Sequence, residues 1–117
     1  MIEKREVDLF LKRLKQIIKI WDVFILDSRP KNSIKDLVSL GITANRRKEV
    51  ILELELIDYC KGPLSETQFN GENMWVFGKI VKGVEIYIKL TIIEDTNKAI
   101  CISFHKAEHP MNFPFKN

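Results

Sequence analysis

Residues 85–105, EIYIKLTIIEDTNKAICISFH, alternate apolar and other side chains with a period of two. This pattern restricts the fold most, because successive side chains of a strand point to opposite faces of a sheet. It predicts two strands joined by the turn EDTNK, and a third strand over residues 74–80 precedes them through a Lys-Gly turn. Sequential antiparallel pairing is the simplest topology. The side chains predicted to face the core are Ile86, Ile88, Leu90, Ile92, Ile100, Ile102 and Phe104.

The first half of the chain carries helical spacing instead. Apolar side chains in residues 3–20 recur at steps of three and four, which predicts an amphipathic helix. A short apolar strand is predicted over residues 22–26, and further helices begin at Ser33 and Thr43. Helices gathered before strands predict an α+β fold, with N-terminal helices packed on a small antiparallel sheet.

Two stretches outside these elements are also interpreted. Residues 61–63, KGP, are predicted to form a turn, and residues 64–73 a polar loop. In the tail PMNFPFK, Phe113 and Phe115 are expected to dock back on the domain.

Length and composition describe an ordinary globular domain spanning residues 1–117. Hydrophobic residues make up 45% of the chain and charged residues 30%, which excludes a disordered chain. The net charge of +3 permits an anionic partner such as RNA without requiring one. Two cysteines provide neither a disulfide framework nor a zinc site. We find no signal peptide or membrane-spanning run, so we expect a cytoplasmic protein with no membrane partner.

The second face of the predicted hairpin carries the candidate chemistry. Tyr87 and Lys89 share one face of their strand. Ser103 and His105 share one face of the next strand, so all four are expected on the same open surface. The alternative interpretation is that these polar side chains have no catalytic role and occupy this face only because it is exposed to solvent.

These residue types suit RNA cleavage without a metal. The reaction needs a base for the ribose 2′-hydroxyl, cations around the phosphate and an acid for the departing 5′-oxygen. His105 can serve as acid or base. Lys61 and Lys89 can neutralise phosphate, and Tyr87 can position the nucleophile or stack on a base.

Two other motifs remain. Residues 105–109, HKAEH, fit the H-x-x-E-H spacing of inverted zinc proteases. That spacing works on a helix, whereas here it follows a predicted strand and stops at Pro110, so we predict no metal. Arg46 and Arg47 can guide RNA, or can simply populate the exposed start of a helix.

Three segments together resemble the MqsR family of bacterial toxins: LELIDYCKGP, MWVFGKIVKGVEIYIKLTII and AICISFH. The shared pattern is an acidic-aromatic turn ending in lysine, a Trp-led strand, a Gly hairpin, a YIKL strand and an SF strand with a basic residue next. The resemblance covers roughly residues 39–105. It implies a RelE-like mRNA interferase without a cofactor, with helices on one side of a curved antiparallel sheet. It also implies inhibition of translation and growth, mRNA as substrate, whether free or on the ribosome, and a cognate antitoxin with a helix-turn-helix DNA-binding part.

The resemblance also implies roles for single residues. The family lysine that follows the acidic-aromatic turn falls on Lys61, and the strand tyrosine falls on Tyr87. The final basic residue, a lysine in well-known members, falls on His105. Lys89 comes from strand alternation and not from the resemblance.

One position departs from the family pattern. The glutamine that follows the Trp in those members is Val76 here. Three explanations are open. The role of the glutamine is dispensable, or Gln68 or Lys79 takes over that role, or the activity of this chain is altered. The rival to a nuclease is therefore a non-catalytic RNA- or protein-binding module of the same fold. The predicted catalytic residues are His105, Tyr87, Lys61 and Lys89, and the predicted RNA contacts are Arg46, Arg47 and Lys79.

Overall fold

The computed structural model describes residues 2–26, 34–65 and 72–116. Its helical elements are α1 (Lys4–Trp21), α2 (Ile34–Ser39), α3 (Ala44–Leu52) and the short 3₁₀ helices η1 (Leu56–Asp58) and η3 (Glu94–Thr96). Its strands are β1 (Val23–Ile25), β2 (Tyr59–Ser65), β3 (Asn73–Val81), β4 (Val84–Ile93) and β5 (Lys98–Lys106). The predicted change from helices to strands along the chain is confirmed.

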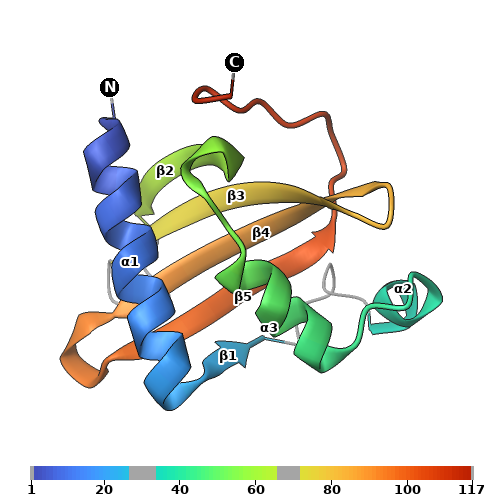
Figure 1. The fold of residues 1–117 in the computed structure, drawn as a ribbon, viewed down its shortest axis with the longest axis horizontal. Helices are drawn as coiled ribbons and strands as arrows, with labels where there is room; N and C mark the ends of the chain where they lie inside the picture. The colour runs from blue at the N-terminus through green and yellow to red at the C-terminus, as the bar shows by residue number, and fades with distance from the viewer. Residues whose placement is uncertain (1, 27–33, 66–71, 117) are drawn as a thin grey trace.

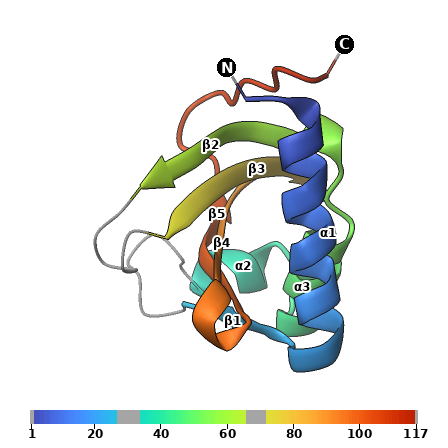
Figure 2. The same cartoon turned by 90° about the vertical axis from the view of Figure 1, so that its left-hand side faces the viewer.

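The described strands form one sheet in the order β1-β5-β4-β3-β2, with α1 and α3 against one of its faces (Figure 1). Figure 2 shows both helices on the same side of the sheet. This arrangement confirms the α+β class. Within the described residues, none of the helices combines the length and the apolar character needed to cross a bilayer.

Helix α1 packs its apolar side on the sheet. The side chains that helical spacing places together are buried: Val7, Leu11, Leu14, Ile17 and Ile18. They share the main core with Phe77 and Ile88 of the sheet. Each such burial stabilises the fold by about 1.5–3 kcal/mol. The helix begins and ends within one residue of the bounds that the apolar spacing predicts.

The predicted starts of the two following helices have different outcomes. The hydroxyl of Thr43 accepts a hydrogen bond from the Arg46 backbone N–H at 3.1 Å, which confirms Thr43 as the cap of α3. Ser33 lies outside the described residues.

Strand β1 corrects the prediction of an antiparallel sheet. It pairs with β5 in parallel, with Val23 beside Ala99. The chain leaves α1 through Asp22, which has a positive φ of 70°. The Asp22 carboxylate accepts from the Val23 N–H at 2.7 Å and lies 3.3 Å from Lys48, and these two contacts lower its pKa. The short strand then covers the outer edge of β5, which would otherwise expose unpaired backbone groups.

Residues 61–63 belong to β2 and do not form a turn, so that prediction is wrong. The pairing of β2 with β3 shifts on both sides of Lys61, so this strand is irregular. The local turn signal Lys-Gly-Pro is present, but the pairing with β3 overrides it. The predicted Lys-Gly turn between β3 and β4 is confirmed, with φ of 53° at Lys82 and 78° at Gly83, as a tight hairpin turn requires.

A β-bulge on β5 corrects the predicted core face. Ser103 pairs with Lys89, but Cys101 pairs with the next residue of β4, so Ile102 is the extra residue. Beyond the bulge the alternation is reversed: Cys101 packs in the main core, whereas Ile100 packs in a second cluster. The prediction that Ile100 and Ile102 face the helix-covered core is therefore wrong.

Candidate functional site

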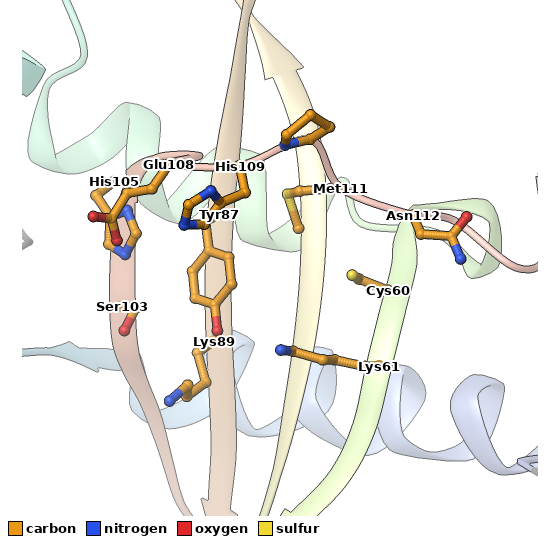
Figure 3. A pocket seen from close by; sticks show the side chains of 11 residues that line it. Cys60, Lys61, Tyr87, Lys89, Ser103, His105, Glu108, His109, Met111 and Asn112 are labelled. Atoms are coloured by element: carbon orange, nitrogen blue, oxygen red, sulfur yellow. The ribbon is translucent and has the colours of Figure 1, made fainter.

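An open cavity of about 440 Å³ lies on the face of the sheet that the helices leave uncovered (Figure 3). Its size falls in the ordinary range of ligand sites, about 300–1,000 Å³. One wall is formed by residues 108–112, which belong to residues 107–116, here called the C-terminal segment. The strands contribute Cys60 and Lys61 of β2, Tyr87 and Lys89 of β4, and Ser103 and His105 of β5.

Tyr87 and His105 lie directly opposite each other on β4 and β5. Their rings stack with centroids 5.0 Å apart and planes 13° apart. The prediction that the phenol and the imidazole share the open face is confirmed. Nδ1 of His105 lies 2.7 Å from the Lys106 carbonyl oxygen, which can only accept, so Nδ1 carries the hydrogen of this contact. Nε2 is then the nitrogen that can exchange a proton with a ligand.

Two lysines flank an apolar residue one row further along the sheet. The cross-strand register runs from Lys61 to Val76, then to Lys89 and Ser103. Val76 is completely buried, although the register puts it on the same face as Lys89. The position of the family glutamine therefore lies between two lysines in the register, and both lysines line one cavity.

Tyr59 fixes the irregular part of β2 that carries Lys61. Its hydroxyl donates a hydrogen bond to the Gly62 carbonyl oxygen. Its ring is 3% exposed and contacts Trp75 and Phe77 edge-on. Burial raises the pKa of the Tyr59 phenol, and the nearby Cys60 and Glu6 raise it further.

Replacing Tyr59 with Phe should therefore lower stability through the loss of one hydrogen bond. We expect the free energy of unfolding in urea to fall by about 0.5–1.5 kcal/mol near neutral pH. Because the folded-state pKa of Tyr59 is raised, the stabilisation is present below the unfolded pKa of about 10 and is lost as the pH rises above it. The stability difference between parent and variant should shrink at high pH. Equal stability near neutral pH would show that the bond contributes nothing.

The predicted RNA contacts on α3 do not line the cavity. Arg46 pairs with Glu49 at 3.5 Å and with Glu53 at 3.1 Å, and the hydrogen bond to Glu53 is the main cause of its raised pKa. Arg47 is 8% exposed. Both residues belong to a helix on the covered side of the sheet (Figure 1).

Lys79 also lies on the helix-covered side. It pairs in register with Ile86, which belongs to the main core, and its ammonium lies 3.1 Å from Asp58. It therefore cannot take the place of a polar group beside Val76 on the other face. Gln68, the other residue considered for that role, lies outside the described residues.

The C-terminal segment supplies cavity residues that the sequence analysis did not assign to this site: Glu108 and His109, which it considered only as part of a zinc motif, and Asn112. The sequence feature that pointed to this segment was its pair of phenylalanines, Phe113 and Phe115. Their predicted docking on the domain is confirmed. Phe115 stacks on Tyr59 with centroids 5.2 Å apart and packs against the main core. Residues 105–109 end a strand and then bend, so the H-x-x-E-H spacing does not fall on a helix.

Comparison with known proteins places the whole sheet in one family. The family model described as "Motility quorum-sensing regulator, toxin of MqsA" matches residues 8–106. The chain belongs to this family. The resemblance predicted over residues 39–105 is thereby confirmed, and it extends to α1 and β1. Searches of curated proteins and of solved structures gave no match.

Membership in the MqsR family has two direct consequences. The chain is a toxin of a toxin–antitoxin system, and the family implies an antitoxin as its partner. The match includes every strand that contributes to the cavity and ends at the last residue of β5. The C-terminal segment lies beyond it.

Proposed function

We propose that this MqsR-family toxin is an mRNA interferase: a RelE-like, metal-independent endoribonuclease that cleaves mRNA and so inhibits translation and growth. One observation carries the proposal. The stacked rings of Tyr87 and His105 line the same open cavity as Lys61 and Lys89. These are a proton-exchanging group, a ribose-orienting phenol and two cations, which together meet the needs of phosphodiester cleavage.

In the proposed reaction the ribose 2′-oxygen bonds to the adjacent phosphorus while the bond from phosphorus to the 5′-oxygen breaks. A base takes the 2′-hydroxyl proton, and an acid gives a proton to the departing 5′-oxygen. The products are a 2′,3′-cyclic phosphate and a 5′-hydroxyl. His105 acts as acid or base through Nε2, because an imidazole can both accept and donate a proton. The Tyr87 phenol orients the ribose beside it.

The two lysines stabilise the phosphate in this reaction. Negative charge grows on the non-bridging oxygens as phosphorus becomes five-coordinate, and ammonium groups already in place lower the barrier. The register places Lys61 and Lys89 on either side of Val76, so they can hold one phosphate between them. Arg46, Arg47 and Lys79 remain predicted RNA contacts away from the cavity.

Purified toxin should cleave a long RNA in EDTA and leave 2′,3′-cyclic phosphate ends, since no proposed step uses a metal. End-specific ligation and sequencing would identify both new ends, for free RNA in EDTA and, in a separate reaction with Mg²⁺, for RNA on translating ribosomes. A matched substrate with 2′-deoxyribose at the cut position should stay intact, because it lacks the nucleophile. RNA binding without cleavage in either setting would contradict the proposal.

One observation favours a second candidate function. The completely buried Val76 puts an apolar side chain where the family glutamine would place a polar group between the lysines. A non-catalytic module that binds RNA or a protein through the same face would tolerate this change. Binding without cleavage in the experiment above would support this function.

We also propose the setting in which the toxin acts. Its substrate requires a cytoplasmic location, and its antitoxin carries a helix-turn-helix DNA-binding part. A short neighbouring gene for such a protein, whose product relieves growth arrest when co-expressed, would support this assignment.

A further inference from the structure

The C-terminal segment is fixed to the sheet at its start and middle. The Ala107 N–H donates to the Glu85 carbonyl oxygen at 2.9 Å. The Met111 N–H donates to Oε1 of Glu85 at 3.2 Å. One residue of β4 thus binds the segment through both its backbone and its side chain.

Gly78 lets the segment lie directly on the sheet. A Cβ atom at this position would come within 2.8 Å of both Met111 Sδ and Phe113 Cζ. Gly78 pairs in register with Tyr87, so the contact occurs on the open face and in the row of the stacked rings. A side chain at residue 78 would have to displace the Met111 and Phe113 side chains that lie over it.

The far end of the segment is anchored in the main core. Phe115 stacks on Tyr59, and the ammonium of Lys4 lies 5.8 Å from the Phe115 ring centroid. The segment therefore crosses from the end of β5 to β2 (Figure 1). Its contacts at the start, middle and far end hold it in place beside the cavity that it lines.

The wall and the lysines lie at opposite ends of the cavity. Figure 3 shows Glu108 and His109 beside the upper part of Tyr87 and His105, whereas Lys61 and Lys89 lie at the other end. A phosphate is attracted to the lysine end, and residues 108–112 of the wall bring no Lys or Arg to the cavity. The space beside Tyr87 and His109 is therefore better suited to an uncharged base, whose edge the His109 imidazole can hydrogen-bond.

We propose that the C-terminal segment forms the wall of a nucleotide subsite beside the scissile phosphate, and that His109 selects the base held there. This inference rests on the proposed nuclease function. It goes beyond the matched family region, because that region ends at residue 106.

The test uses the variant His109→Ala in the full chain. The His109 side chain is exposed and lines the cavity, so the change removes a base contact with little effect on the core. The ends of all fragments from a randomised RNA library would be sequenced for the parent and the variant. We expect the preference for the best base next to the cut to fall about two- to tenfold, as the loss of one hydrogen bond implies. Lys116→Ala, in the same segment but outside the cavity lining, should keep the parent's preference.

The outcomes separate the two proposals. Cleavage by the variant with unchanged base preference, or a uniform loss over all sequences, would overturn the subsite. Absence of cleavage by the parent protein would overturn the proposed function and the subsite with it. A shifted base preference with the Lys116→Ala control unchanged would support both.

Discussion

Replacing His105 with Ala should slow RNA cleavage by about 10²- to 10⁴-fold, the usual contribution of a positioned acid or base. The fold should persist, because His105 is half-buried on the open face and belongs to neither apolar cluster. Single-turnover cleavage of a short RNA measures the rate, and relief of growth arrest in cells gives an independent readout.

Two further measurements separate a chemical role of His105 from a structural one. Added imidazole should restore part of the cleavage by the alanine variant if the missing group transfers a proton. His105→Lys should keep measurable activity, because well-known members of the family carry a lysine at this place. Parent-like toxicity of the alanine variant, with an unchanged urea unfolding curve, would remove His105 from the reaction.

The shared face of Tyr87 and His105 was predictable from sequence because it depends on local information, whereas the register that stacks their rings was not. A tight turn at Lys82 and Gly83 and strict alternation along β4 place Tyr87 on the open face. On β5 the bulge at Ile102 lies before Ser103, so the alternation from Ser103 to His105 is undisturbed. The same reasoning fails for Ile100, which lies on the other side of the bulge.

Features that depend on distant parts of the chain were not predictable in this way. The parallel pairing of β1 joins residues more than seventy positions apart, and no local pattern records it. The close approach of Met111 to Gly78 is likewise decided by tertiary packing. A glycine in a strand indicates that a close contact is possible, but it does not indicate which residue makes that contact. Lys61 was predicted as a phosphate contact from its residue type and from the family resemblance, whereas the local prediction of a turn at residues 61–63 was wrong.

The second large effect is expected at the two lysines. Replacing Lys61 or Lys89 with Met keeps an apolar stem of similar length and removes the charge, so each variant should lose about 10²–10³-fold in cleavage rate. If both ammonium groups hold one phosphate across Val76, removing the second charge should lower the cleavage rate by a smaller factor than removing the first. The double variant would then lose less than the product of the two single losses.

A matched control separates this local effect from the general charge of the protein. Lys98→Met removes the same charge from β5 at an exposed position outside the cavity lining, where the ammonium lies 5.3 Å from the Phe24 ring centroid. Its cleavage rate should stay near that of the parent. Equal losses in all three single variants would mean that net charge, and not the row from Lys61 to Lys89, governs the reaction. Losses confined to Lys61 and Lys89, with a salt dependence of RNA binding reduced by about 0.7 per lost phosphate contact, would place the phosphate in that row.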